Sequence, residues 1–249
     1  MESIGSSTAK GGYKEEYYMT NFINENNVYI ARLFGCNSIK TRVSLADKAY
    51  VLSGTHKTDI IWDYKIQHKK TKEGQFGQVC RYWLDHMHKH VPMSANVLRI
   101  LRGMCELPLD KKNDKICDKT CRVKKLLRIN YTERQLNSVI DYFEKNKLDI
   151  LKMVFLGHNE KYIPDIISCS IFKGKKRHKI LMWSTKDVLD YFSLQKCRIR
   201  KSGTVIEIGQ YLTFQRKGGD GGKKQANQFQ FKAIISKIPN PLYVKIFDN

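Results

Sequence analysis

The chain has 249 residues, and its 45 Lys and Arg against 24 Asp and Glu give a formal net charge of +21. This length allows one or two domains whose core needs no disulfide support. Such an excess of positive charge causes self-repulsion in a compact fold, so a polyanionic partner explains it better than a solvated basic surface or a lipid-facing patch. The 13 Tyr and 11 Phe exclude a disordered basic tail and, interleaved with the cations, favour nucleic acid as the partner.

The first twelve residues are small and polar, without the apolar stretch of a secretory signal. No run approaches the roughly 18 apolar residues that cross a membrane. We therefore expect a cytoplasmic protein with no membrane partner.

The first expected helix covers residues 13–34. Its apolar residues recur near helical spacing, and Gly35 follows where a left-handed C-terminal residue is favoured. These apolar residues are Tyr17, Phe22, Ile23, Ile30, Leu33 and Phe34.

Residues 55–71 alternate in polarity and are rich in β-formers, which predicts a hairpin. If its loop is formed by residues 62–64, Ile61 pairs with Lys65 and Asp59 pairs with Gln67. A register shifted by one residue would send these polar side chains to different faces.

In that register Asp59, Gln67 and Lys69 share one face, whereas His68 and Lys70 point to the other. A carboxylate and an amide oxygen are suitable ligands for Mg²⁺ together with water and a phosphate oxygen. Lys69 can then stabilise the attacking water or the charge at phosphorus. The alternative is a surface hairpin with an Asp–Lys ion pair worth less than about 1 kcal/mol.

Further helices are predicted over residues 75–90, from Ser94 to Arg102, and from a capping box at residues 132–135 to residue 145. The first rests on the spacing of Phe76, Val79, Trp83 and Met87. The charged, irregular residues 110–125 predict an exposed connection.

Seven Cys without a paired framework indicate reduced thiols. Cys105, Cys117 and Cys121, with a histidine among residues 86–90, offer a weak zinc-binding pattern. Ordinary thiols are the favoured alternative.

Strands are predicted near residues 150–155, 165–172 and 179–183, and Ser184 should cap a short helix to Phe192. From Arg198 onward the pattern favours β-strands interrupted by a glycine-rich loop. The mixture predicts an α/β fold of the α+β type, with a mixed central sheet flanked by helices.

The closing strand, residues 227–233, should seat Phe229 and Phe231 on the core and turn Gln228, Gln230 and Lys232 toward DNA. The preceding loop contains four glycines that permit close approach to a backbone, and cations suited to phosphates. These cations are Arg216, Lys217, Lys223 and Lys224. A flexible basic hairpin is the alternative.

Asp59 followed by the Gln67-x-Lys69 strand resembles the signature of the PD-(D/E)XK nucleases. The likeness continues in order along nearly the whole chain, and is poor only over residues 110–125 and 163–197. The ordered set resembles monomer-acting type II restriction endonucleases that cut GCGC with a 5′ overhang. Its segments are residues 5–16, 51–54, 76–78 with 83–84, 98–102, 106–108, 215–220 and 230–232.

The resemblance implies a Mg²⁺-dependent active site at Asp59, Gln67 and Lys69, with Glu16 helping to bind the metal through water. Gln67 stands where the family usually has Glu, which lowers the negative charge around the metal, and the hairpin is shorter than in relatives. Gln78 and Arg81 match positions that recognise the central base pairs. The family usually has Lys at the second position, and Arg keeps the bidentate contact with guanine.

We expect a catalytic core with a recognition helix in residues 1–110 and a β-rich DNA-recognition subdomain in residues 111–249. The expected activity is that of a type II site-specific deoxyribonuclease on double-stranded DNA, at GCGC or, next, CCGG. It should act as a monomer or a weak dimer, and a cognate methyltransferase should act on the same site without needing to bind. The expected DNA contacts are Gln78, Arg81, Arg216, Lys217, Lys223, Asn227, Gln228, Gln230 and Lys232.

Two other functions remain open from the residues alone. A repair or structure-specific nuclease on the same fold would cut without regard to sequence. A non-catalytic DNA-binding module would bind with strong salt dependence and cut nothing, but it would have no use for the Asp59–Lys69 pair.

Overall fold

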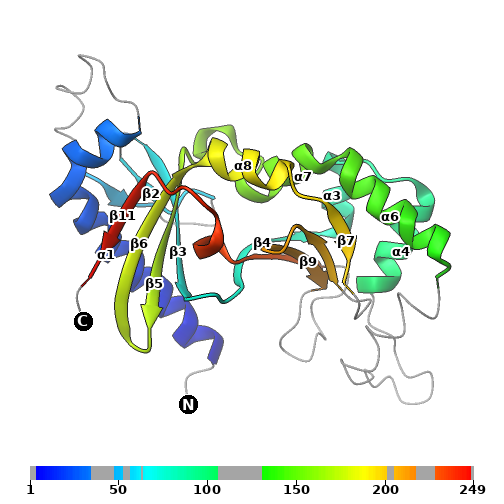
Figure 1. Ribbon diagram of the computed structural model, residues 1–249, viewed down its shortest axis with the longest axis horizontal. Helices are drawn as coiled ribbons and strands as arrows, with labels where there is room; N and C mark the ends of the chain where they lie inside the picture. Colours follow the sequence, from blue (N-terminus) through cyan, green and yellow to red (C-terminus); the bar gives the residue numbers. More distant parts are fainter. Residues whose placement is uncertain are drawn as a thin grey trace. The chain divides into compact units, whose positions relative to one another are not determined.

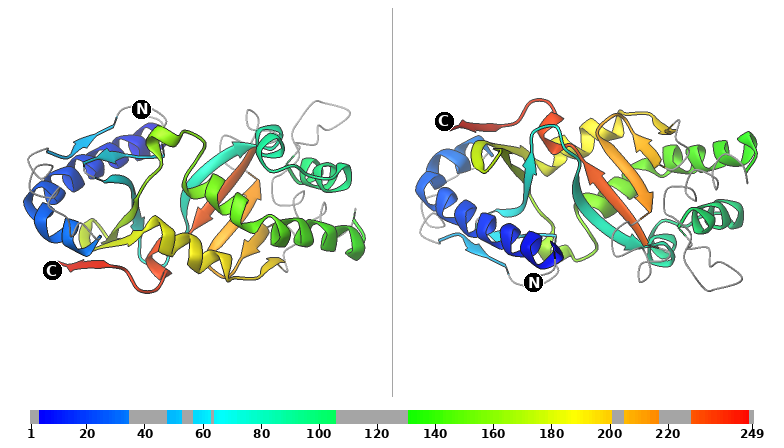
Figure 2. Two further views of the ribbon diagram at one scale, coloured as in Figure 1. Left: turned by 90° about the horizontal axis from the view of Figure 1, so that it is seen from above. Right: turned by 90° about the horizontal axis from the view of Figure 1, so that it is seen from below.

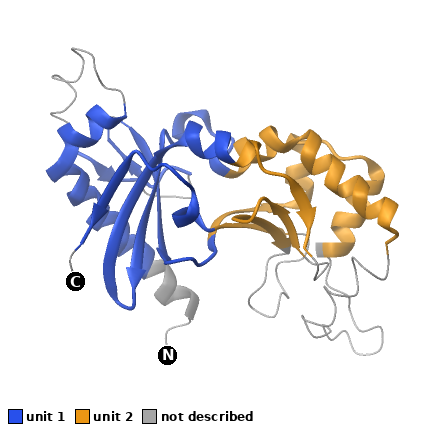
Figure 3. Ribbon diagram, viewed as in Figure 1, with its two compact units in different colours: residues 1–77, 155–191, 234–249 blue, residues 78–154, 192–233 orange. Residues whose placement is uncertain are grey.

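The computed structural model describes residues 4–34, 48–52, 57–62, 64–105, 131–200, 205–216 and 228–247. The chain forms two compact units, shown in different colours in Figure 3. Unit 1 comprises residues 1–77, 155–191 and 234–249, and unit 2 comprises residues 78–154 and 192–233. Among the described helices, none has the length and apolar character needed to cross a bilayer.

Unit 1 is built on a six-stranded mixed sheet with the strand order β1-β2-β3-β5-β6-β11 (Figure 1). Only β3 and β5 pair in parallel; the other neighbours are antiparallel. The strands are β1 (Tyr50–Val51), β2 (Ile60–Ile61), β3 (Lys65–Lys72), β5 (Ile166–Lys173), β6 (Lys176–Ser184) and β11 (Tyr243–Ile246).

Helix α1 (Ile4–Leu33) packs along this sheet, as the two views of Figure 2 show. Its Met19, Ile23 and Ile30 are fully buried in one cluster with Ile66 of β3 and Ile166 of β5. This burial explains why the expected helix forms. It begins earlier than residue 13, and Gly35 lies outside the described residues.

Unit 2 contains a second sheet of five strands, in the order β4-β10-β9-β8-β7. The ring of Phe143, in a covering helix, lies 4.8 Å from that of Phe214 in β9. The strands are β4 (Gly77–Trp83), β7 (Cys197–Ile199), β8 (Val205–Ile208), β9 (Leu212–Arg216) and β10 (Gln228–Ala233). The α-helices are α3 (Leu84–His90), α4 (Ala95–Cys105), α6 (Glu133–Lys145) and α7 (Lys147–Phe155), while α8 (Thr185–Ser193) spans the boundary between the units.

Three of the predicted helix starts are confirmed by their hydrogen bonds. In the capping box, the Thr132 hydroxyl accepts from the Gln135 amide at 3.3 Å and the Thr132 amide donates to the Gln135 side chain at 2.9 Å. Ser94 Oγ accepts from the amide of Val97 at 3.3 Å, and Ser184 Oγ accepts from that of Asp187 at 3.0 Å. Each bond satisfies an amide that the first helical turn leaves unpaired.

Two predicted elements are wrong. Residues 75–90 form strand β4 before the short helix α3, because β4 pairs with β10 and buries Val79 and Cys80. Residues 150–155 belong to helix α7, in which Ile150, Leu151, Met153, Val154 and Phe155 are buried. A short apolar run of this kind fits a buried helix as well as a strand.

The compact units divide the chain differently from the single boundary expected near residue 110. Unit 1 recruits β5 and β6 from the middle of the sequence and β11 from its end. The reason is the parallel pairing of β3 with β5, because parallel neighbours need a long crossover, and most of unit 2 lies within it.

Candidate active site

The hairpin β2–β3 of unit 1 has the register expected from the sequence. Ile61 pairs with Lys65 and Ile60 with Ile66, and the Asp59 amide donates to the Ile66 carbonyl at 2.9 Å. The predicted pairing of Ile61 with Lys65 is confirmed, whereas Asp59 and Gln67 are not a pair of the ladder, because the Asp59 amide bonds to Ile66, which also pairs with Ile60. The Asp59 side chain still reaches the face of β3 that carries Gln67 and Lys69.

Asp59 and Lys69 meet on that face. Lys69 Nζ donates to Asp59 Oδ2 at 3.0 Å, and the same oxygen accepts from the backbone amide of His68 at 2.7 Å. Within the described part of the chain, Asp59 Oδ1 accepts no hydrogen bond. The side chains are 25% exposed for Lys69 and 17% for Asp59, so both are held in place yet remain open to a ligand.

Gln67 precedes Lys69 on β3 and is 1% exposed. Its Oε1 is buried with no hydrogen-bond partner among the described residues. Leaving a buried acceptor unpaired costs about 1–3 kcal/mol, and a bound ion or water that contacts the oxygen would remove this cost. An amide oxygen on the same face as a carboxylate fits the oxygen donors that a hard divalent cation prefers.

Glu16 comes to the same place from helix α1. Burial raises the pKa of its carboxyl, the Asp59 carboxylate raises it further, and the Lys69 ammonium opposes the rise. Two neighbouring carboxyl groups that disfavour each other's charge are relieved by a bound cation. The donor set of Asp59, Glu16 and Gln67 therefore fits a divalent metal ion.

A buried polar network supports the opposite face of β3. His68 Nδ1 is hydrogen-bonded to Ser168 Oγ at 2.6 Å, and its Nε2 lies 3.9 Å from Glu15 Oε1. Glu15 in turn accepts two hydrogen bonds from Arg177, at 3.0 and 2.9 Å. Burial acts to raise the pKa of Glu15, but the interactions with His68, Arg177 and Ser170 outweigh it and lower the value to about 2.

This network connects directly to the candidate active site. His68 presents its amide to Asp59, and Glu15 is adjacent to Glu16 on α1. The guanidinium of Arg177 also lies 3.2 Å from the Tyr18 ring centre, which clamps α1 against β6. The relative placement of Asp59 and Glu16 thus depends on charges buried behind them, which sequence reasoning missed because an isolated Glu or Arg gives no sign of its partner.

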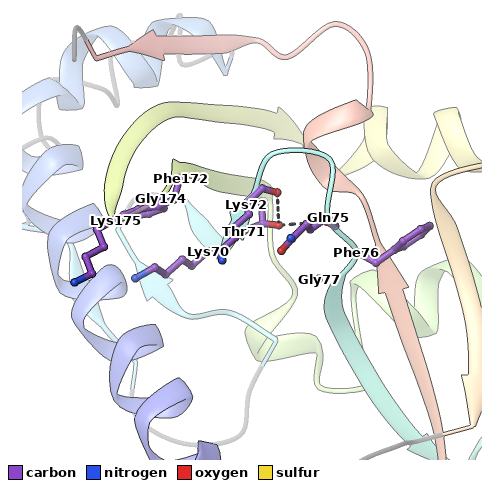
Figure 4. Close-up of a pocket in the computed structure, with 9 residues that line it drawn as sticks. All are labelled: Lys70, Thr71, Lys72, Gln75, Phe76, Gly77, Phe172, Gly174 and Lys175. Atoms are coloured by element: carbon purple, nitrogen blue, oxygen red, sulfur yellow. Dashed lines mark hydrogen bonds between the residues drawn. The ribbon is translucent and has the colours of Figure 1, made fainter.

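A basic pocket of about 480 Å³ lies farther along unit 1, at the end of β3 (Figure 4). Lys70 Nζ lies 4.5 Å from the ring centre of Phe172, and the side chains of Lys70 and Lys175 extend in the same direction, whereas Phe76 points away. Its lining contains no carboxylate, which makes it suited to an anion. The lining residues are Lys70, Thr71, Lys72, Gln75, Phe76, Gly77, Phe172, Gly174 and Lys175.

In unit 2, β10 separates apolar from polar side chains as expected. The rings of Phe229 and Phe231 lie 3.9 and 4.5 Å from that of Phe214 in β9. Gln228 and Gln230 alternate with them but are each only 8% exposed, so they are more buried than an open reading surface requires.

Gln230 contacts Gln78 of β4 through Nε2 and Oε1. Tyr82 of β4, in contrast, packs against Phe231, which faces the other side of β10. Residues four apart on a regular strand would share a face, so the alternation of β4 must break between them.

The break falls where Val79 and Cys80 are both buried. It brings the exposed Arg81 to the same face as Gln78 and Gln230. The two positions expected to recognise bases thus lie together, on a strand and not on the recognition helix that the sequence suggested.

Only some of the other residues expected to contact DNA lie within the described part of the chain. Lys232 is half-buried on β10, on the face of the glutamines. Arg216 ends β9 opposite Phe229, and its side chain is outside the description. Lys217, Lys223 and Asn227 lie outside the described residues, as do Cys117 and Cys121 of the zinc pattern; Cys105 ends α4.

Comparison with known proteins identifies the family. The model of the R.HinP1I restriction endonuclease family matches residues 42–238. No curated protein sequence matches the chain significantly. The crystal structure of restriction endonuclease MspI in complex with its cognate DNA matches with a TM-score of 0.52 and 13% identity, covering 88% of this chain and 82% of that one.

At that identity the likeness to MspI shows the fold, and it confirms the predicted α+β architecture with a mixed sheet flanked by helices. Restriction endonucleases of this kind generally use a divalent metal ion, which agrees with the oxygen donors around Asp59. Because the family model spans most of its length, this chain belongs to the R.HinP1I restriction endonuclease family and is a sequence-specific type II restriction endonuclease, a site-specific deoxyribonuclease.

Proposed function

We propose that this endonuclease hydrolyses double-stranded DNA at a short GC-rich palindrome, GCGC in first place and CCGG next, with Mg²⁺ as its cofactor. The single observation that supports the mechanism is the contact of Asp59 with Lys69 on the face of β3 that also carries Gln67, whose oxygen has no hydrogen-bond partner among the described residues. The order of the two sites rests on the resemblance of the sequence segments to GCGC-cutting enzymes.

Asp59 and Gln67 would hold the metal directly, and Glu16 would assist through water. Bound Mg²⁺ would polarise a phosphate oxygen and favour ionisation of the attacking water. The Asp59 carboxylate keeps Lys69 positioned, and the ammonium is then ready to donate to the phosphate oxygens as negative charge grows on them. The His68 amide fixes Asp59 during this process, so little reorganisation is needed.

We assign cutting to unit 1 and base recognition to unit 2. Gln78, Arg81 and Gln230 would contact base edges, with Gln228, Lys232 and Asn227 beside them. Arginine suits guanine because its fork matches O6 and N7. Phosphates would be bound by Arg216, Lys217 and Lys223, and the lysine-lined pocket of unit 1 adds positive charge for the DNA backbone.

The enzyme would act as a monomer or a weak dimer in the cytoplasm. A cognate methyltransferase would protect the same site in the host DNA, without a requirement that it bind this protein.

The test is digestion of a fully sequenced plasmid with Mg²⁺, followed by mapping of every end. Discrete fragments whose ends fall at GCGC support the proposal, and ends at CCGG select the second site. Ladders independent of sequence would favour a structure-specific nuclease. Tight, salt-dependent binding without cleavage under any divalent ion would favour a binding module. Lys69→Ala serves as the matched inactive enzyme.

A further inference from the structure

The five-stranded sheet of unit 2 carries a polar row that runs beyond the glutamines. In the paired strands, Gln230 lies opposite Gln215, and Gln215 lies opposite Val205. The amide of Arg200 then donates to the carbonyl of Val205 at 2.8 Å. One line across the sheet therefore joins Gln230 on β10 to Arg200, just after β7.

A second line runs beside it. Lys232 pairs with Thr213, Thr213 with Glu207, and Glu207 with Arg198. Because facing residues of paired strands project to the same side, Arg198 and Arg200 share the sheet face of Gln230 and Lys232.

Glu207 holds both arginines in fixed positions. Arg198 Nε donates to Glu207 Oε2 at 2.7 Å, and Arg200 Nε donates to Oε1 at 2.6 Å. The carboxylate side chain is only 4% exposed, whereas the side chains of Arg198 and Arg200 are 63% and 42% exposed. The three residues and Ile199 line a cavity of about 470 Å³.

Two observations distinguish this arrangement from ion pairs that only hold neighbouring strands together. One arginine would neutralise one buried carboxylate, so the second leaves a net positive charge on the surface. Arg200 contacts Glu207 through Nη2 as well as Nε, whereas Arg198 is bonded to it through Nε and, with 63% of its side chain exposed, presents the rest of its guanidinium at the surface. Such a fork is suited to phosphate oxygens or to guanine.

The position of the arginines within the sheet decides between these two ligands. Neighbouring strands are about 4.8 Å apart, so β7 lies roughly 14 Å from β10, across three strand spacings. The major groove is about 12 Å wide. When Gln78 and Gln230 lie at base edges, groups this far away reach past the groove to the sugar–phosphate backbone.

We propose that Arg198 and Arg200, oriented by the buried carboxylate of Glu207, form a phosphate clamp on the DNA backbone that flanks the recognised bases. This inference rests on the proposed function of unit 2 in DNA recognition. It adds two contacts that fix the register of the duplex and carry no base information of their own.

The experiment measures binding of wild type and an Arg198→Ala/Arg200→Ala variant to a GCGC duplex and to a duplex of shuffled sequence, in EDTA and over a range of salt. Loss of two phosphate contacts lowers the salt slope by about 1.8 for both duplexes. The ratio of the two affinities stays unchanged.

The control variant also removes two positive charges, but from a helix on the apolar face of the sheet. Arg134→Ala/Lys145→Ala changes two exposed residues of α6, the helix whose Phe143 packs on the apolar face. Its salt slope should remain near that of the wild type. An equal slope change in this control would show that net charge alone matters, and would overturn the clamp.

The lysine double variant, Arg198→Lys/Arg200→Lys, tests orientation. Both charges remain, so the slope stays near wild type, but affinity falls about equally for both duplexes because the fork is lost. Unchanged affinity would contradict the role of Glu207.

A lower melting temperature in the alanine variant with an unchanged slope would reduce the arginines to a structural role. If the wild type itself binds neither duplex, the proposed function fails and not the clamp alone.

Discussion

The two sheets of this endonuclease use polar residues in opposite ways. In unit 1, β3 has polar side chains on both faces: Gln67 and Lys69 on one, His68 on the other, backed by the buried pair of Glu15 and Arg177. In unit 2, β10 is divided into an apolar face and a face of amides. A catalytic site must hold charges at fixed distances, so its strand needs buried polar contacts on the opposite face. A recognition surface needs only apolar packing beneath its strand.

The largest expected effect is on stability, from breaking the support of unit 1. Arg177→Met leaves Glu15 buried without its bidentate partner, which should lower the free energy of unfolding by about 3–5 kcal/mol. Denaturant unfolding measures this directly. Lys186→Met breaks the exposed ion pair with Asp190 and should cost less than about 1 kcal/mol. Equal losses in the two variants would show that the network has no special importance.

The same network should make the metal-free protein sensitive to acid. The pKa of Glu15 lies at about 2 when folded against an ordinary 4.5, so its ionised form favours the folded state. The stabilisation, on the order of 3 kcal/mol, is complete above pH 4.5 and is lost as the pH falls toward 2. Unfolding in EDTA across this range should show the loss in wild type and a flatter profile in Arg177→Met. Parallel profiles would assign the acid sensitivity to other groups.

The next effect is on the chemical step. Lys69→Ala should reduce the single-turnover cleavage rate by at least roughly 10²-fold, about 2.7 kcal/mol, because a main charge partner of the transition state is gone. DNA affinity should change little. Lys70→Ala, the neighbouring lysine on the opposite face, should keep the rate at saturating DNA. Normal cutting by Lys69→Ala would remove the lysine from the mechanism.

A smaller effect should fall on sequence choice. Arg81→Ala removes a bidentate base contact and should reduce discrimination between the cognate site and single-base variants by about 1–3 kcal/mol. Lys223→Ala should weaken binding to all duplexes alike. Competition binding with a set of variant duplexes separates the two patterns, and matched losses in both variants would contradict the division into recognising and positioning residues.

Much of the fold follows from local patterns. The capping box at Thr132, the serine caps at Ser94 and Ser184, and the alternation of β10 all predicted their elements because each depends on neighbours in sequence. The hairpin register that joins Asp59 to Lys69 was predictable for the same reason.

The remainder depends on distant contacts. Residues 77–83 became a strand because β10, far along the chain, supplies hydrogen-bond partners. The break in alternation at Val79 and Cys80 and the contact of Glu15 with Arg177 likewise depend on residues that are far apart in the sequence. The burial of Gln67 is of this kind, since its partner on the neighbouring strand, Ile167 of β5, lies far along the chain.

The central claim is that Asp59 and the unpaired oxygen of Gln67 hold the metal ion beside Lys69. Its most direct test is the Mg²⁺ concentration that gives half-maximal single-turnover cleavage in wild type, Gln67→Glu and Gln67→Leu. The added carboxylate should lower that concentration roughly tenfold, and leucine, which has no ligand atom, should raise it beyond measurable range. Identical Mg²⁺ dependence in all three proteins would contradict the claim.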